Sequence, residues 1–445
     1  MIRIANGQGF WGDWLEAPVR LVEQGPIDYL ALDYLAEITM SILQKQKQAD
    51  PNFGYARDFP PLVARIAGKI CERGIKVIAN AGGVNPVACA REVVRLAPGL
   101  KVAVVLGDDV FARLDEFLAK GYEMRDMDTG EPIARIRSQI LSANAYIGAF
   151  PLAEALATGA DVVIAGRSTD TALTLAPMVH RFGWKPDDFD RLAAGTIAGH
   201  IIECGAQSTG GNCQVDWQTI PDMAGIGYPI VEAEPDGTFS ITKHPAAGGR
   251  VNTHVIKEQL LYELGDPRNY ITPDCVADFT TIRLEDAGPD RVRVTRIRGG
   301  PHPPTLKLSI AYAAGWKSAG TLVYSWPQAL EKAQAADRIV RDRLRQIGLS
   351  FDEIYTEYFG VNACLGSAAP PNPDPPEVQV RIGVRGPDRK AVDRFTRELI
   401  PLVLNGPPGA TGFGEGRPAV REIVAYWSAL VPRDEIATRV EVVTA

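Results

Sequence analysis

The chain has 445 residues, of which 46% are hydrophobic and 23% charged, with a formal net charge of −7. This length predicts two or three domains, and the composition is that of a soluble globular protein. Nucleic acids and anionic membranes require clustered Lys and Arg, so the charge argues against both as partners and favours a small-molecule substrate.

Cysteine usage and the N-terminus indicate the compartment. The six cysteines are dispersed without a CxxC pair, which argues against a disulfide framework or a four-cysteine zinc site. The sequence begins directly with a strand-like segment and shows no signal-peptide pattern. No apolar run approaches the roughly 20 residues that cross a bilayer. We therefore expect a reduced, cytoplasmic protein.

Residues 1–212 alternate short β-rich runs with amphipathic stretches. Strands are predicted at 2–5, 29–33, 76–80, 102–106 and 162–165, and helices at 15–24, 60–73, 86–96 and 111–120. Apolar strands separated by helices are typical of a parallel sheet that is covered on both faces. The fold class is therefore predicted to be α/β, with an N-terminal β/α domain that is either an open sheet or a partial barrel.

Each of these strands ends in polar or small residues. They are Asn6, Gln8, Asp33, Asn80, Gly82, Gly83, Asp108, Asp109, Gly166, Arg167, Ser168 and Asp170. Ligands of parallel α/β folds bind beyond the carboxyl ends of the strands, so this set predicts a substrate site there. The alternative is helix capping by Asn, Asp and Ser, for which Asn85 before Pro86 is the clearest candidate.

The segment 201–212 combines titratable groups with a glycine-rich turn. Glu203 and Cys204 precede Ser208, Thr209, Gly210, Gly211 and Asn212, whose backbone and hydroxyl groups could hold an oxyanion or phosphate. The alternative is a turn that closes the domain, with an inert buried thiol.

Three residues are predicted to carry the chemistry. Cys204 is a candidate nucleophile, with His200 four residues earlier as its partner on a helix, while Glu203 or Asp109 would act as the base. Arg167 is the predicted anchor for a carboxylate or phosphate, unless it pairs internally with Asp170 or Asp109.

No cofactor is predicted outright, and a divalent cation stays an alternative. Asp108 or Asp109 could form an oxygen-rich Mg²⁺ or Mn²⁺ site with Asp33, Glu203 or His244. The turn at 7–9 lacks the third glycine of a dinucleotide fingerprint, so NAD binding is not expected.

The C-terminal half changes in character. Residues 213–319 are rich in Gly, Pro and alternating segments, which predicts an α+β insertion or second layer; the alternating basic run 291–298 fits the solvent face of a strand. Residues 320–445 are predicted to form a ferredoxin-like βαββαβ module, with a Pro-rich linker at 368–376. Its sheet edges could pair between chains and form a homo-oligomer.

Several segments together resemble the AtuA family, named for acyclic terpene utilisation. They are NGQGFWGD at 6–13, KVIANAGG at 76–83, GRSTD at 166–170, ECGAQSTGGN at 203–212 and LLYELGDP at 260–267. The tail from about residue 377 resembles a ferredoxin-fold module that accompanies this domain. The resemblance implies a setting in the bacterial catabolism of branched acids and acyclic terpenes, alongside acyl-CoA enzymes, and a CoA moiety as part of the substrate is an alternative to the free acid.

The sequence thus favours a hydrolase, hydratase or lyase acting on a branched carboxylic acid or its acyl-CoA thioester. Two alternatives stay open. The chain could be a non-catalytic metabolite-binding or assembly subunit that oligomerises through its C-terminal module, or a nucleotide-dependent enzyme.

Overall fold

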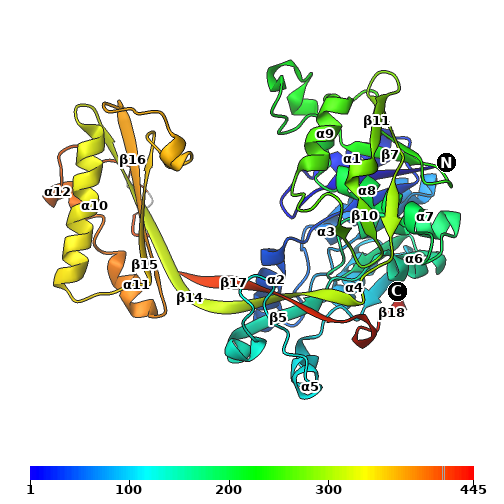
Figure 1. Ribbon diagram of the computed structural model, residues 1–445, viewed down its shortest axis with the longest axis horizontal. Coiled ribbons are helices and arrows are strands. Elements are labelled where there is room, and N and C mark those ends of the chain that lie inside the picture. The colour runs from blue at the N-terminus through cyan, green and yellow to red at the C-terminus, as the bar shows by residue number, and fades with distance from the viewer. Residues whose placement is uncertain (413, 415, 445) are drawn as a thin grey trace. The chain divides into compact units, whose positions relative to one another are not determined.

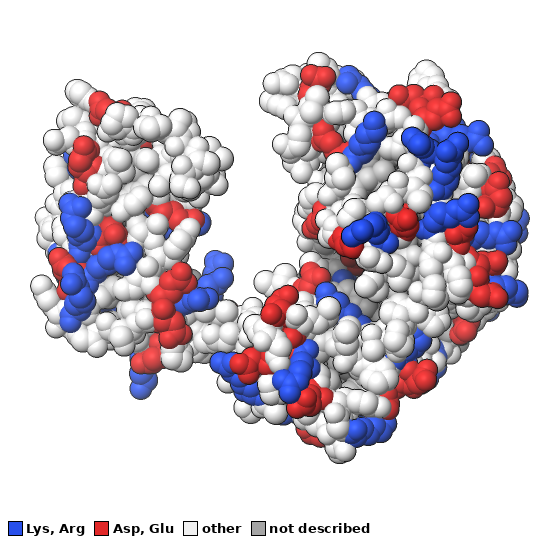
Figure 2. Space-filling view, viewed as in Figure 1, with Lys and Arg blue, Asp and Glu red and all other residues white. Residues whose placement is uncertain are grey.

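The computed structural model describes residues 1–412, 414 and 416–444. The chain forms two compact units, Met1–Ala311 together with Tyr426–Ala445, and Tyr312–Ala425 (Figure 1). No helix among the described residues is both long enough and apolar enough to cross a membrane. Basic and acidic side chains are interspersed on the face of the protein shown in Figure 2.

The first unit is built on an open ten-stranded sheet. Its centre is five parallel strands in the order β1-β2-β3-β6-β4. They are β1 (Ile2–Gln8), β2 (Tyr29–Leu32), β3 (Lys76–Ala79), β6 (Val162–Ala165) and β4 (Val102–Leu106). The five predicted parallel strands are therefore present, and their Val, Ile, Leu and Ala side chains are almost all buried because helices cover both faces.

The helices divide between the two faces of this sheet. One apolar core joins the strands to α1 (Glu16–Gln24), α2 (Glu37–Ala49), α3 (Phe59–Arg73) and α4 (Pro86–Leu96). The core on the other face contains α6 (Ala149–Ala157), α7 (Ala172–Phe182), α8 (Phe189–Ile202) and α9 (Thr253–Leu261). Helix α7 packs against both α6 and α8 (Figure 1). The chain changes face after β4 and returns to insert β6 between β3 and β4, which creates a switch point where α/β proteins bind ligands.

Antiparallel strands extend this sheet at both edges. Beyond β1 lie β7 (Pro229–Ala233), β8 (Phe239–Lys243), β12 (Arg291–Thr295) and β11 (Arg283–Asp286), and beyond β4 lies β18 (Arg439–Val443). Much of the segment expected as an insertion or second layer thus continues the main sheet. A separate three-stranded sheet contains β9 (Tyr270–Ile271), β10 (Val276–Asp278) and β13 (Arg298–Gly300). Its strands β10 and β13 pack against α8.

The second unit has a sheet in the order β15-β16-β14-β17. Its strands are β14 (Thr305–Ser325), β15 (Glu353–Phe359), β16 (Glu377–Gly386) and β17 (Arg421–Pro432), and the outer parts of β14 and β17 belong to the first unit. Helix α10 (Ala329–Gln346) presents Ala333, Ala336, Val340 and Leu344 to a core shared with α11 (Arg389–Phe395). The remaining short elements include α5 (Leu114–Ala119), α12 (Leu402–Asn405) and β5 (Ile140–Ala145), which pairs with β14.

Candidate functional site

Polar side chains that follow β2 and β3 form a buried network. Asn80 donates its side-chain N–H to Asp33 Oδ1 over 2.7 Å, and its side-chain oxygen accepts the backbone N–H of Tyr34 over 2.7 Å. Asp33 Oδ1 also accepts the N–H of Leu35 at 3.0 Å. These bonds hold the two residues rigidly at the carboxyl edge of the sheet.

A second network joins the ends of β4 and β6. Asp108 Oδ2 accepts the backbone N–H of Arg167 at 2.7 Å and the side-chain N–H of Asn144 at 2.9 Å. Burial raises the pKa of Asp108 to about 6, although both hydrogen bonds oppose this. A Cβ at Gly166 would lie 2.4 Å from Asp108 Oδ2, so the glycine of this motif permits the close approach of the carboxylate.

The guanidinium of Arg167 is buried between the two networks, with the residue only 1% exposed. It donates to the carbonyl oxygen of Leu35 and to Asp170 Oδ1, the latter at 3.3 Å, and lies 4.3 Å from the ring centroid of Tyr146. Tyr146 in turn donates its hydroxyl to Glu37 Oε1 at 3.0 Å. The Nε atom of Arg167 has no acceptor among the described residues. Arg167 therefore makes the internal pair with Asp170 and retains one free donor.

Asp33 and Asp170 form a carboxyl pair beside this arginine. Burial and the charge of Asp170 raise the pKa of Asp33 well above its ordinary value. Burial likewise raises the pKa of Asp170, whereas the positive charge of Arg167 and a hydrogen bond to Asp33 lower it by less. Both carboxyl groups therefore bind a proton more tightly than an ordinary Asp side chain does.

Glu203 and His200 form a second proton-sharing pair at the C-terminal end of α8. His200 Nδ1 lies 3.1 Å from Glu203 Oε1, and the Tyr270 hydroxyl lies 3.4 Å from the same nitrogen. Burial raises the pKa of Glu203 to about 7, and the negative charges of Asp170 and Glu263 act in the same direction. Burial disfavours the protonated form of His200, but the bond to Glu203 outweighs it and raises the pKa of the imidazole. The pair therefore titrates near neutral pH, as a general acid or base requires.

Cys204 is next to this pair but has a different environment. Burial, followed by the charge of Glu203, raises the pKa of the thiol to about 12, so it is protonated at neutral pH. His200 bonds to Glu203 rather than to Cys204. The backbone of this segment lies against the end of β1, where Asn6 Nδ2 donates to the carbonyl of Glu203 at 2.8 Å and a Cβ at Gly9 would lie 3.0 Å from Cys204 C. No activating cation for the thiol is evident among the described contacts.

Several expected site residues have internal contacts instead. Ser208 and Thr209 are buried and donate their hydroxyls to the carbonyls of Ile201 and Ala206, so these hydroxyl hydrogens are not directed at a ligand. Asn212 bonds to Gln207 at 2.8 Å. The glycines of this turn pack closely: a Cβ would lie 2.9 Å from Ile220 at Gly210 and 2.9 Å from Ala206 O at Gly211.

Other strand-end residues have similarly local roles. Asp109 is exposed, and its Oδ1 accepts the N–H of Phe111 at 3.0 Å. Gln8 donates to the carbonyl of Phe10 at 3.0 Å. Asn85 precedes α4 as expected but makes no cap; it donates to the carbonyls of Pro51 and Phe53 because these lie within reach of its amide. The glycines after β3 allow close packing, since a Cβ would lie 2.6 Å from Ala165 O at Gly82 and 2.2 Å from Leu43 at Gly83. Ser168 is fully buried, and its hydroxyl has no partner among the described residues.

Sequence reasoning missed part of this site. Glu37, Asn144, Tyr146, Gln259 and Tyr270 come from segments without a distinctive local pattern, and only folding brings them to the carboxyl edge. Glu263 did have a signal, because it lies within the 260–267 segment, and its backbone φ of 55° is left-handed.

The metal alternative finds little support in the arrangement of these side chains. The described residues contain no group of three or more His, Cys, Asp or Glu placed to hold a metal ion. His244, one of the suggested ligands, accepts the N–H of Ala246 at 3.1 Å in a turn after β8.

Comparison with known proteins identifies the family. The family model described as acyclic terpene utilisation family protein AtuA matches residues 2–442. The chain therefore belongs to this family, which confirms the resemblance of its strand-end motifs. No curated protein and no solved structure matches the chain.

Proposed function

We propose that this AtuA-family protein is an enzyme of acyclic terpene utilisation that adds water to, or removes it from, a branched acyclic carboxylic acid or its acyl-CoA thioester. The observation that carries the proposal is the Glu203–His200 pair, whose carboxyl has a pKa of about 7. The Asp33–Asp170 pair, in which burial raises the pKa of both carboxyl groups, would supply a second acid at the same edge of the sheet, and the charge of Asp170 acts on Glu203.

Two proton-carrying pairs suit the addition of water across a carbon–carbon double bond. The Glu203 carboxylate would take a proton from water as the water oxygen bonds to one carbon, and the Asp33–Asp170 pair would give its proton to the other carbon. Elimination is the reverse of this step. The same base could activate water for hydrolysis of a thioester, whereas the high pKa of Cys204 disfavours a covalent thiolate route.

Apolar side chains near the same edge support a branched hydrocarbon substrate. Phe10 follows β1 and is 56% exposed, Ile38 in α2 is 61% exposed, and Leu261 at the end of α9 is 72% exposed. Side chains of this kind would contact the hydrocarbon chain of such a substrate. Arg167, with its free Nε donor, would orient the carboxylate or thioester oxygen of the substrate.

The test compares Glu203→Gln with Cys204→Ser. Acyclic terpenoid enoic acids and their CoA thioesters are incubated with the protein in H₂¹⁸O, and incorporation of ¹⁸O is measured by mass spectrometry. We expect Glu203→Gln to lower kcat about 100-fold or more, and to abolish a pH-rate limb near 7, because a general base is lost. Cys204→Ser should retain activity within about fivefold. Full activity of Glu203→Gln would reject the acid–base proposal, and an inactive Cys204→Ser would favour a thiolate route instead.

A second proposal concerns assembly. The strand order β15-β16-β14-β17, with α10 between β14 and β15, supports a ferredoxin-like topology for the second unit. Strand β15 is at the edge of this sheet, and its Tyr355 is 53% exposed. An edge of this kind could pair with a second copy of the chain, which supports a homo-oligomer. Light scattering of Thr356→Pro, which removes a backbone donor from β15, would test this: an unchanged oligomeric mass would reject pairing through this edge.

A further inference from the structure

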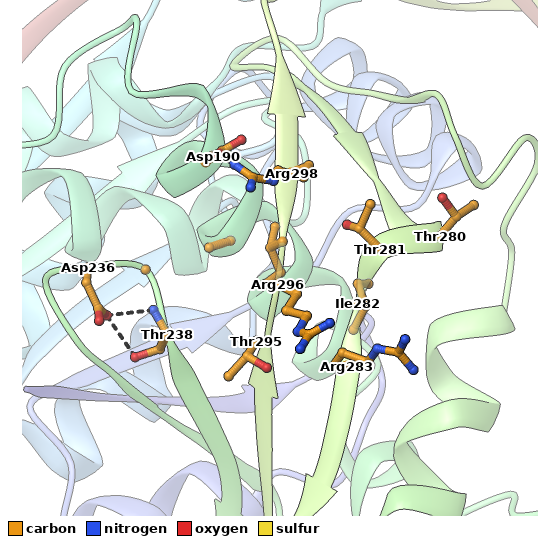
Figure 3. Close-up of a pocket in the computed structure, with 13 residues that line it drawn as sticks. Asp190, Asp236, Thr238, Thr280, Thr281, Ile282, Arg283, Thr295, Arg296 and Arg298 are labelled. Atoms are coloured by element: carbon orange, nitrogen blue, oxygen red, sulfur yellow. Dashed lines mark hydrogen bonds and ion pairs between the residues drawn. The ribbon is translucent and has the colours of Figure 1, made fainter.

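A cavity of about 810 Å³ lies in the first unit, away from the Glu203 site (Figure 3). Its lining comes from the start of α8, the turn between β7 and β8, and the adjoining parts of β11, β12 and β13. The polar residues that matter here are Asp190, Thr238, Arg283, Thr295, Arg296 and Arg298. Its volume is within the range of cavities that hold small organic molecules.

Helix α8 separates this cavity from the proposed catalytic groups. The cavity includes Asp190 and Ala194 near the start of the helix, whereas His200 and Glu203 are at its other end. Fourteen residues of α-helix extend about 21 Å, and the residues of α8 from Leu192 to Ile202 are buried along that length. The cavity is therefore a second location that does not depend on the proposed function.

The acidic groups of the cavity already have partners. Asp190 accepts Arg298 Nη1 at 2.6 Å and the N–H of Gly299 at 2.9 Å. Asp236 accepts the N–H and the hydroxyl of Thr238 within its own turn, at 2.9 Å and 2.7 Å (Figure 3). Neither carboxylate is left to neutralise another arginine by direct contact.

Two arginines of the cavity are different. Among the residues that the structure describes, neither Arg283 nor Arg296 forms an ion pair with a carboxylate. Arg283 in β11 pairs across the β11–β12 ladder with Thr295, and Arg296 follows Thr295 in the link to β13 (Figure 3). Both residues are exposed.

The backbone at Arg296 adds an independent observation. Its φ of 60° is in the left-handed region, which a side chain with a Cβ rarely adopts. Residues held in such conformations are concentrated at ligand-binding and catalytic sites. A left-handed backbone conformation and two arginines without a carboxylate partner thus lie at one cavity, and a bound anion would neutralise their charge.

We propose that this cavity binds a phosphorylated small molecule, with a phosphate group held between Arg283 and Arg296. Guanidinium groups present forked N–H donors that match phosphate oxygens, and the hydroxyl of Thr295 adds a further donor within the same lining. Ile282 and Ile297 provide apolar surface for the organic part of the ligand. Arg296 belongs to the alternating basic run 291–298. It would thus contact the ligand, while other residues of the run lie on the strand surface.

The experiment measures binding to the full chain by isothermal titration calorimetry at about 150 mM salt. The probes are pyrophosphate and adenosine 3′,5′-bisphosphate, which distinguish recognition of the phosphate groups alone from recognition of a larger organic phosphate. We expect at least one probe to bind, and Arg283→Gln/Arg296→Gln to weaken its binding about tenfold or more because the charge-assisted hydrogen bonds are lost. Circular dichroism should show the same fold in both proteins.

Arg293→Gln is the matched control, since Arg293 is exposed on strand β12, three residues before Arg296, but does not line the cavity. Its effect on binding should be within about twofold at this salt concentration, because charges that are not in contact are screened. Failure of both probes to bind would overturn the proposal. The proposal would also be overturned if Arg293→Gln weakened probe binding as much as Arg283→Gln or Arg296→Gln alone. Equal weakening would indicate nonspecific attraction of the probe to basic residues.

Discussion

Replacing Asp108 with asparagine should change how folding stability depends on pH. Asp108 is 3% exposed, and its pKa is raised from 3.8 to about 6 by burial. The unfolded chain releases this proton near pH 3.8, whereas the folded chain retains it until about pH 6. The stability that this group contributes is therefore fully present below pH 3.8 and is lost as the pH rises through 6. The difference between the two pKa values corresponds to about 3 kcal/mol.

Asparagine can accept both hydrogen bonds that reach Asp108 Oδ2, but it does not titrate. The free energy of unfolding of Asp108→Asn minus that of the wild type should therefore rise by about 2.5 kcal/mol between pH 4 and pH 7.5. The assay is urea unfolding followed by circular dichroism at several pH values in this range. Asp109→Asn is the matched control, because it removes the same charge from an exposed neighbour and should have an effect below about 0.5 kcal/mol throughout. A difference between Asp108→Asn and the wild type that stays constant across the range would refute the reasoning.

Two further predictions concern Cys204 and Gly166. At pH 7.5, iodoacetamide should label Cys204 about 100-fold more slowly than the exposed Cys364, as measured by peptide mass spectrometry, because burial raises the pKa of the Cys204 thiol to about 12; equal rates would contradict this environment. Gly166→Ala should lower the free energy of unfolding by about 2 kcal/mol or more, because its Cβ would lie 2.4 Å from Asp108 Oδ2. Gly68 is exposed in α3 with no atom within 4 Å of an added Cβ, so Gly68→Ala should raise the free energy of unfolding by up to about 1 kcal/mol. Similar thermal shifts for the two variants would contradict the packing argument.

The sequence alone predicted the parallel strands because their signal is local. Each is a short run of Val, Ile, Leu or Ala between amphipathic helices, and β4 occupies the predicted residues 102–106. The periodic signal is absent from helix α7, since its residues from Ala172 to Val179 are all buried and it contains Pro177. A helix that is buried all round has no polar face, so its period cannot be recognised. Strand β14 was likewise recognised only in part, because it begins at Thr305 rather than near residue 320.

For the candidate site, the sequence determined which polar residues follow the strands, and so brought Asp33, Asn80 and Arg167 to one edge of the sheet. Only the tertiary structure decided that His200 pairs with Glu203 and that Glu37 and Tyr146 complete the surroundings of Arg167. It also decided the protonation of Glu203 and Cys204, because a pKa depends on burial and on charges supplied by distant segments. The order of side chains along a strand follows directly from the local sequence. Desolvation and hydrogen-bond partners, in contrast, arise only when the layers of the fold have packed together.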